Sequence, residues 1–313
     1  MTRVAVLDDY QRVAGSLADW GSVPGDVVFF HDHLATEDEL VARLEGFDVV
    51  VAMRERTPFP ESLLARLPAL RLLVTTGPRN AAIDLAAAHH RGIVVSGTRA
   101  DPQGTPELTW GLVLALLRHV PAEDRGVREG AWQRTIGTGL AGKKLGVLGL
   151  GRVGAVVAPV GGAFGMRVIA WSPHLTRERA AAAGAAFVER DRLFEESDVL
   201  TVHVVLGEGT RGLVGPAELA LMKRTAYLIN TSRGPIVDEA ALVTALEEGS
   251  IAGAGLDVYD VEPLPAGHPL LTAPNTVLTP HIGYVTDTGY RAMYTDAVHD
   301  IAAYLDGKPL REL

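Results

Sequence analysis

The 313-residue sequence contains no cysteine. The chain therefore forms no disulfide bond and uses no cysteine as a nucleophile or metal ligand. It also lacks an excess of basic residues, since 29 Lys and Arg against 38 Asp and Glu give a formal net charge of −9 at pH 7. A net negative charge argues against nucleic acid or an anionic membrane surface as a partner.

Long apolar segments are absent as well. The longest helical apolar stretch, Leu108 to Leu117, is too short to span a bilayer. The amino-terminal MTRVAVLDD enters a strand-like pattern at once and lacks the apolar core of a signal peptide. An apolar content of 47% and a mean hydropathy of +0.16 are typical of a globular protein. We therefore expect a cytoplasmic protein with no membrane partner.

The chain alternates short apolar runs with amphipathic stretches, which predicts parallel sheets covered by helices. Its length favours two domains. We expect two doubly wound α/β domains. The first consists of residues 1–100 plus 286–313, because the last helix, about 287–306, follows the second domain and can return to the first. The second consists of residues 101–285.

Residues 97–105 are polar and rich in turn formers, as expected of a crossing between domains. Thr105 and Pro106 then predict a helix start, with Thr105 as the N-cap and Pro106 at the first helical position. This helix, to about His119, is apolar nearly all round, which predicts burial between domains or against another subunit.

A glycine motif, GLGRVG at residues 149–154, follows an apolar run and precedes a small-residue helical stretch and a second apolar run. Gly149 permits a tight turn, Gly151 lets the backbone approach a pyrophosphate, and Gly154 lets a helix pack closely on the strand. The flanking elements supply the context that this motif requires, so it predicts a dinucleotide site. A glycine-rich turn without a nucleotide and an S-adenosylmethionine site remain as alternatives.

The ribose-binding carboxylate expected roughly 20 residues after the motif begins is missing. The neutral Ser172 stands there, followed by His174, Arg177 and Arg179. A carboxylate would bind the ribose 2′-hydroxyl and repel a 2′-phosphate, so its absence leaves both NAD and NADP open as cofactor.

Two loops after strand-like runs of the first domain carry arginines, Arg54 in one and Arg79 in the other. Loops at the carboxyl ends of parallel strands bind ligands. The arginines either form an anion pocket for a small acid or are solvated loop charges.

Three segments after strand-like runs of the second domain carry Arg233, Glu262 and His281. Hydride transfer between a nicotinamide and a carbon bearing a hydroxyl needs a proton donor or acceptor, a role that suits histidine. A neighbouring carboxylate orients such a ring and favours its protonated form. An arginine holds a substrate carboxylate with two-point geometry. The three residues together therefore predict a hydride-transfer site.

The segments GLGRVG, NTSRGPIVDEAAL, GLDVYDVEPLP and TPHIGY closely resemble the D-2-hydroxyacid dehydrogenase family, and the resemblance covers the whole chain. It implies a flavodoxin-like substrate domain, a Rossmann domain and hydride transfer between NAD(P)(H) and a D-2-hydroxy acid or 2-keto acid. Arg233, Glu262 and His281 would be catalytic. Members of the family are usually homodimers joined through the nucleotide domain. In this chain, helix 106–119 and Trp132 would contribute to that interface.

The resemblance also places Asp257 near the nicotinamide carboxamide, Thr109 near the nicotinamide and Thr210 beside the adenosine. Backbone amides of Gly77 to Asn80 would hold the substrate carboxylate. We expect no metal site. The predicted substrate-binding residues are Arg54, Gly77, Pro78, Arg79 and Asn80, and the predicted cofactor-binding residues are Gly149, Gly151, Arg152, Val153, Gly154, Trp171, Ser172, His203, Thr210, Thr231, Asp257 and Thr109.

The chain departs from the family pattern at the substrate loop, where the usual Gly-x-Gly is replaced by Gly77-Pro78-Arg79. Proline removes an amide donor and arginine adds a cation. The change indicates either a substrate with a second anionic group or an arginine that points to solvent. Val205 stands where the family commonly has proline, which slightly reshapes the adenine pocket.

Three competing functions remain. A dehydrogenase of another small oxyanion, such as formate or phosphite, would share the fold, but the Arg–Glu–His set favours a hydroxy or keto acid. An exposed peptide-binding groove or a long disordered tail would favour a non-catalytic dinucleotide-sensing co-repressor, and the sequence offers neither. An S-adenosylmethionine enzyme does not explain Arg233, Glu262 and His281 together.

Overall fold

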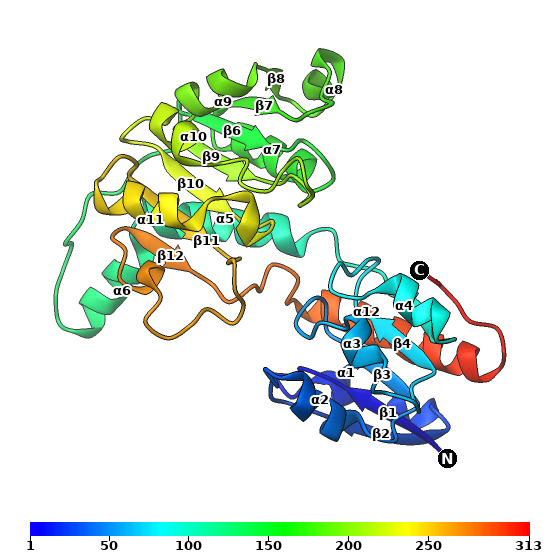
Figure 1. Ribbon diagram of the computed structural model, residues 1–313. Coiled ribbons are helices and arrows are strands. Elements are labelled where there is room, and N and C mark those ends of the chain that lie inside the picture. The colour runs from blue at the N-terminus through cyan, green and yellow to red at the C-terminus, as the bar shows by residue number, and fades with distance from the viewer. The chain divides into compact units, whose positions relative to one another are not determined.

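The computed structural model describes residues 1–313 and divides into two compact units (Figure 1). The first unit contains Met1–Asp101 and Tyr284–Leu313, and the second contains Pro102–Gly283. Each unit is built around one parallel sheet, which confirms the predicted fold class of two α/β domains.

The first unit holds a five-stranded sheet in the order β2-β1-β3-β4-β5. The order reverses between β1 and β3, and such a point is where α/β sheets bind ligands. The elements are β1 (Thr2–Val6), α1 (Ala14–Leu17), η1 (Trp20–Ser22), β2 (Gly25–Phe29), α2 (Glu37–Leu44), β3 (Val49–Ala52), α3 (Glu61–Leu64), β4 (Leu72–Thr75), α4 (Leu85–His90), β5 (Val94–Gly97) and α12 (Asp287–Leu305).

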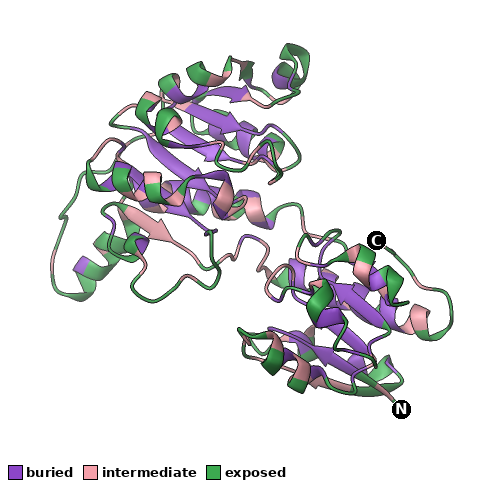
Figure 2. Ribbon diagram, in the orientation of Figure 1, coloured by how far each residue is buried: buried purple, intermediate pink, exposed green.

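Two apolar clusters cover the two faces of this sheet. Leu40 and Leu44 of α2 pack on one face together with residues of α3. Met293, Tyr294 and other residues of α12 pack on the opposite face. The central strands β3 and β4 are buried along their whole length, as Figure 2 shows in purple. Burial on both faces explains why these strands are continuous apolar runs.

The second unit holds a seven-stranded sheet in the order β12-β11-β10-β9-β6-β7-β8, with all strands parallel. The order reverses between β6 and β9, as in dinucleotide-binding folds. The elements are α5 (Gly104–Leu117), α6 (Val120–Arg128), β6 (Lys144–Leu148), α7 (Gly154–Ala163), β7 (Arg167–Trp171), α8 (Arg177–Ala182), β8 (Ala186–Phe187), α9 (Arg190–Glu196), β9 (Val199–Val202), α10 (Pro216–Leu221), β10 (Tyr227–Asn230), η2 (Gly234–Ile236), α11 (Glu239–Glu247), β11 (Gly253–Leu256), η3 (Pro269–Leu271) and β12 (Thr276–Leu278).

Helix α5 corrects two sequence-based expectations. It begins at Gly104 with Gln103 as N-cap residue, so Thr105 is not the cap. The Thr105 hydroxyl instead donates to the carbonyl oxygen of Gly283 at 3.2 Å. The apolar side of α5 packs within its own unit, because glycines of β11 leave room for it. A Cβ atom on Gly255 would lie 3.2 Å from Cβ of Leu112.

None of the helices combines the length and the apolar character that a bilayer crossing requires.

Close packing of α7 on β6 depends on its small residues. A Cβ atom on Gly161 would lie 2.6 Å from Cδ2 of the buried Leu145, whereas one on the adjacent Gly162 would meet open space. Both glycines lie in the same helix, so they form a matched pair for testing the contact.

We expect Gly162→Ala to stabilise the protein by up to about 1 kcal/mol, since alanine is the better helix former. Gly161→Ala should instead destabilise it, because overpacking costs about 1–3 kcal/mol and exceeds that gain. Urea unfolding of the two variants measures both free energies. Equal stabilisation by the two substitutions would contradict the close contact.

Candidate active site

The predicted site residues of the second unit lie at the carboxyl edge of one sheet. Strands β6, β7, β9, β10, β11 and β12 are parallel, so the segments that follow them project from the same edge. Trp171 ends β7 itself. In chain order the following segments carry the glycine turn, Ser172, His203, Thr231 and Arg233, Asp257 and Glu262, and His281.

The glycine turn has the backbone that its sequence predicts. Gly149 adopts φ +103°, and a Cβ atom there would lie 2.5 Å from the amide nitrogen of Val204. A Cβ atom on Gly154 would lie 2.2 Å from the carbonyl oxygen of Gly149. Gly151 faces open space and is exposed. The turn thus leads directly into α7 and leaves an open backbone cradle, which fits a dinucleotide pyrophosphate.

Arg152 and Val153 complete the turn. Arg152 is exposed, and Val153 is the N-cap residue of α7. Trp171 ends β7, where its carbonyl oxygen accepts a hydrogen bond from the Gly149 N–H at 2.8 Å. The turn is therefore anchored to the neighbouring strand.

Ser172 is also joined to the glycine turn. Its Oγ accepts a hydrogen bond from the Leu150 N–H at 2.9 Å, so the hydroxyl can still donate its own proton to another acceptor. Arg179 donates to the carbonyl oxygen of His174 at 3.3 Å. The guanidinium of Arg177 lies 5.1 Å from the ring centroid of Phe187. Cationic side chains thus follow β7 at Arg177 and Arg179, with Glu178 between them, and position 172 itself carries no carboxylate.

The side chains of His203 and Thr210 both form hydrogen bonds within the protein. Burial lowers the pKa of His203 to about 3, so the ring is neutral, and its Nε2 lies 2.9 Å from Oγ1 of Thr201. The Thr210 hydroxyl donates to the carbonyl oxygen of Val205 at 2.6 Å and closes that loop. Neither side chain brings a charge to the edge of the sheet.

A pair of buried threonines links α5 to the loop after β10. Thr109 Oγ1 donates to the carbonyl oxygen of Thr105 at 2.8 Å and lies 2.8 Å from Oγ1 of Thr231. Because the Thr109 hydroxyl already donates its proton to Thr105, the Thr231 hydroxyl is the donor of the second bond.

The loop that carries Arg233 is shaped by Asn230. The Asn230 amide donates to the carbonyl oxygen of Arg233 at 3.0 Å and accepts from the Ser232 N–H at 3.0 Å. Arg233 itself donates to the carbonyl oxygen of Ser232 at 2.7 Å. The next residue must be glycine, because a Cβ atom on Gly234 would lie 2.0 Å from the carbonyl carbon of Tyr259.

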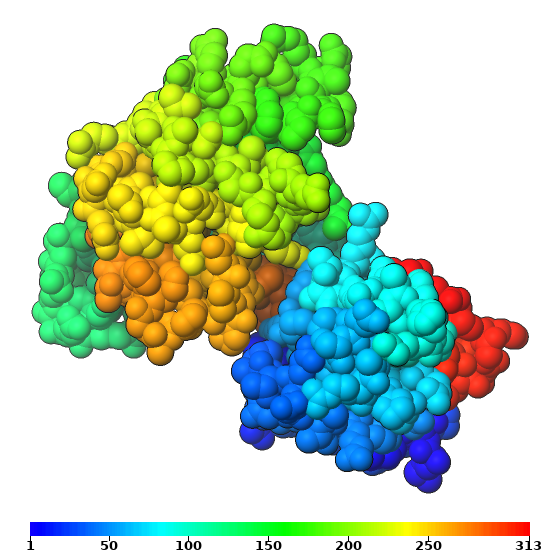
Figure 3. All heavy atoms as spheres, in the orientation of Figure 1, coloured from blue at the N-terminus to red at the C-terminus, as the bar shows by residue number.

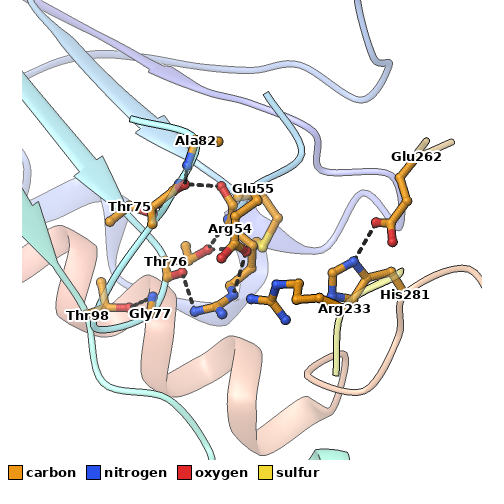
Figure 4. Close-up of polar contacts among 12 residues, drawn as sticks. Arg54, Glu55, Thr75, Thr76, Gly77, Ala82, Thr98, Arg233, Glu262 and His281 are labelled. Atoms are coloured by element: carbon orange, nitrogen blue, oxygen red, sulfur yellow. Dashed lines mark hydrogen bonds and ion pairs between the residues drawn. The ribbon is translucent and has the colours of Figure 1, made fainter. Parts of the chain in front are cut away.

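Glu262 and His281 form a direct pair. Nδ1 of His281 lies 2.5 Å from Oε2 of Glu262, the contact drawn as a dashed line in Figure 4. The other Glu262 oxygen accepts from the Tyr259 N–H at 3.0 Å. Both side chains are partly exposed, 20% for His281 and 34% for Glu262. The carboxylate therefore orients the ring while solvent still reaches the pair.

Asp257 holds the loop on which His281 lies, a role that the sequence did not indicate. It is buried, and its two oxygens accept from Thr279 Oγ1 at 2.6 Å, from the Ile282 N–H at 2.8 Å and from the Gly283 N–H at 2.9 Å. Burial raises the pKa of Asp257. His281, between these anchors, adopts φ +55°, a conformation that surrounding bonds must impose on a non-glycine residue.

In the first unit, Arg54 lies over the predicted substrate loop. Its guanidinium donates to the carbonyl oxygen of Thr76 at 3.2 Å, and its N–H donates to Thr76 Oγ1 at 2.8 Å (Figure 4). A Cβ atom on Gly77 would lie only 1.7 Å from Nη1 of Arg54. Gly77, at φ +104°, is therefore required both by the turn and by the arginine above it.

The substrate loop has fewer backbone N–H groups available for a substrate than its length indicates. The Gly77 N–H already donates to Thr98 Oγ1 at 2.6 Å, and Pro78 has no N–H. Asn80 uses its side-chain amide to donate to the carbonyl oxygen of Arg54 at 2.6 Å and to Thr75 Oγ1 at 2.9 Å. Of the backbone N–H groups expected to bind the substrate carboxylate, those of Arg79 and Asn80 are left. The Arg79 side chain beside them is exposed.

Arg56, outside the predicted set, lies at the same edge. It donates to the carbonyl oxygen of Asp8 at 2.7 Å and to the Tyr290 hydroxyl at 3.3 Å. Its guanidinium lies 4.3 Å from the ring centroid of Tyr10 and 5.6 Å from that of Tyr284. The aromatic partners come from both ends of the chain, so no local sequence pattern identifies them.

No group of three or more His, Asp or Glu side chains in the structure is arranged to hold a metal ion.

Comparison with known proteins supplies the family. Residues 110–283 match the model of the D-isomer specific 2-hydroxyacid dehydrogenase, NAD binding domain. Glyoxylate reductase of Aeropyrum pernix is 42% identical over 256 residues, which cover 79% of this chain and 76% of that protein. Phosphoglycerate oxidoreductase of Vibrio cholerae O395 is 35% identical, with a TM-score of 0.94 over 98% of this chain and 100% of that one.

D-3-phosphoglycerate dehydrogenase of Methanocaldococcus jannaschii is 37% identical over 277 residues, which cover 87% of this chain but only 52% of that protein. The chain therefore spans about half the length of this type of relative. The matched domain and the relatives together identify the chain as a member of the D-isomer-specific 2-hydroxyacid dehydrogenase family, the NAD(P)-dependent oxidoreductases that act on CH–OH donors.

Proposed function

We propose that the chain reduces a small 2-keto acid to the D-2-hydroxy acid, with Arg233, Glu262 and His281 as its catalytic residues. The observation that carries this proposal is the 2.5 Å contact between His281 and Glu262 at the sheet edge that also bears the glycine turn. Histidine paired with a carboxylate is suited to proton transfer near neutral pH.

Bound NAD(P)H supplies the hydride, and the cradle formed by Gly149, Gly151 and Gly154 fits its pyrophosphate. Arg233 binds the substrate carboxylate and polarises the keto group by charge-assisted hydrogen bonds. His281 uses Nδ1 to bind Glu262, so Nε2 is the atom that donates the proton to the carbonyl oxygen. Glu262 holds the ring in position for this transfer.

The substrate is a 2-keto acid of two or three carbons, in line with relatives named glyoxylate reductase and glycerate dehydrogenase. Arg54 and the exposed Arg79 add two cations at the substrate loop, which supports a second anionic group on the substrate. Assays of glyoxylate, hydroxypyruvate and phosphohydroxypyruvate, each with NADH and NADPH, distinguish these candidates. The cytoplasmic location expected from the sequence stays a prediction.

We expect His281→Gln to lower kcat by about 10²- to 10⁴-fold, because glutamine cannot supply the proton. The dissociation constant for NADH, measured by fluorescence, should stay nearly unchanged. His90→Gln, at an exposed position of the first unit, is the control. Near-normal turnover of His281→Gln would refute the mechanism.

The chain accepts NADP(H) as well as NAD(H) in this proposal, because Ser172 places no negative charge beside the ribose. Ser172→Asp should weaken NADPH binding roughly tenfold or more, since like charges about 4 Å apart near a surface repel by about 1–4 kcal/mol. NADH binding should not weaken. Fluorescence titration with both cofactors, with Ser172→Ala as control, measures the change. An unaltered preference would show that Ser172 lies away from the ribose site.

The protein forms a homodimer through α6 and the segment after it, which lie along one edge of the second unit (Figure 3). Trp132 is 78% exposed and Ile136 is 95% exposed, and Val127 of α6 is exposed as well. Clustered exposed apolar side chains mark interaction surfaces.

Trp132→Glu should therefore shift the protein from dimer toward monomer in sedimentation-velocity experiments. Leu310→Glu, which changes an exposed leucine of the first unit, should leave the dimer intact. A monomeric wild-type protein would overturn the proposed assembly.

A further inference from the structure

The segment that carries Glu262 has little regular structure of its own. It leaves β11 after Leu256 and does not enter another element until η3, which begins at Pro269. Most of residues 260–269 are exposed, including Glu262. The position of the Glu262 carboxylate therefore depends on the few contacts that fasten this segment to the rest of the unit.

One side chain, Glu239, makes two of these contacts. Its Oε2 accepts from the Asp260 N–H at 3.2 Å, and its Oε1 lies 3.0 Å from Nε2 of His268. The two side chains are largely covered, with 16% of Glu239 and 19% of His268 exposed. Glu239 is the first residue of α11, where a carboxylate is favoured by the helix dipole.

The direction of the hydrogen bond between His268 and Glu239 follows from the contact that Nδ1 of His268 makes. Nδ1 accepts from the Leu270 N–H at 3.3 Å and so caps η3. An accepting Nδ1 carries no proton, so the proton is on Nε2, which donates to Glu239. The Glu239 carboxylate and the His268 imidazole thus close the segment from residue 260 to residue 268.

We propose that Glu239 is a positioning residue for the acid–base pair. By holding the backbone at Asp260 and the side chain of His268, it keeps Glu262 within hydrogen-bonding distance of His281. The proposal rests on the proposed function of Glu262 and His281. Gly234 supports the same arrangement from the other side, because the backbone of Tyr259 and Asp260 packs directly on it.

Other charged groups face these two pairs. His281 faces Glu262 and the buried Asp257. Asp260 faces Glu239, Arg211, Asp238 and His268, and partial burial together with Glu239 raises its pKa.

The test uses Glu239→Ala, which removes both anchors, and Glu247→Ala, which removes an exposed carboxylate from the opposite end of the same helix. Glu239→Ala should lower kcat about 10²-fold, the effect of misplacing a catalytic group by about 1 Å. The dissociation constant for NADH should not change. Glu247→Ala should behave as wild type.

The pH profile separates positioning from a merely structural role. A loosened Glu262 no longer holds the proton-donating ring of His281 in place, so the pH profile of kcat/KM for keto-acid reduction should shift in Glu239→Ala. Glu239→Gln keeps an acceptor for Asp260 but loses the acceptor for His268, and it should restore part of the activity and of the profile. A structural role alone would leave the profile in place.

His268→Ala is the second variant, needed if Glu239→Ala does not fold. It should lower kcat several-fold, shift the profile in the same direction, and add little to Glu239→Ala in the double variant. Wild-type kcat and pH profile in both single variants would overturn the proposal. If Glu262→Gln and His281→Gln also kept their turnover, the proposed function itself would fail, so the two failures are distinguishable.

Discussion

Parallel pairing of the strands is the constraint on which the candidate site depends. In the second unit it brings the ends of six strands to one edge, so residues from Gly149 to His281 meet although the sequence separates them widely. The reversal of strand order between β6 and β9 opens that edge beside the glycine turn. Backbone hydrogen bonding of the sheet thus brings these segments to one edge.

Side-chain hydrogen bonds then fix the loops that leave this edge. Asn230 shapes the loop of Arg233, Asp257 holds the loop of His281, and Glu239 fastens the segment of Glu262. Each anchor is a short polar side chain that binds main-chain groups of an irregular segment. Such segments have no internal strand or helix hydrogen bonds, so these side-chain bonds decide where the candidate catalytic side chains lie.

The sequence predicted the order and type of most elements, because buried parallel strands are continuous apolar runs and the glycine motif has a specific context. It also singled out Arg233, Glu262 and His281. It predicted Thr105 as the N-cap of α5 and Pro106 as its first helical residue, because a Thr-Pro pair is a common helix start. The hydroxyl of Thr105 is instead bonded to Gly283, a partner distant in sequence.

The sequence by itself determined the two α/β sheets, the glycine turn and the residue types that hydride transfer requires, since each follows from local spacing and chemistry. Only the tertiary structure decided how these residues are held. The contacts of Glu239 with His268, of Asp257 with Ile282 and of Gly234 with Tyr259 join segments that no periodicity relates. It also showed that the Gly77 N–H donates to the Thr98 hydroxyl. That hydrogen bond depends on a distance in space that the sequence does not reveal.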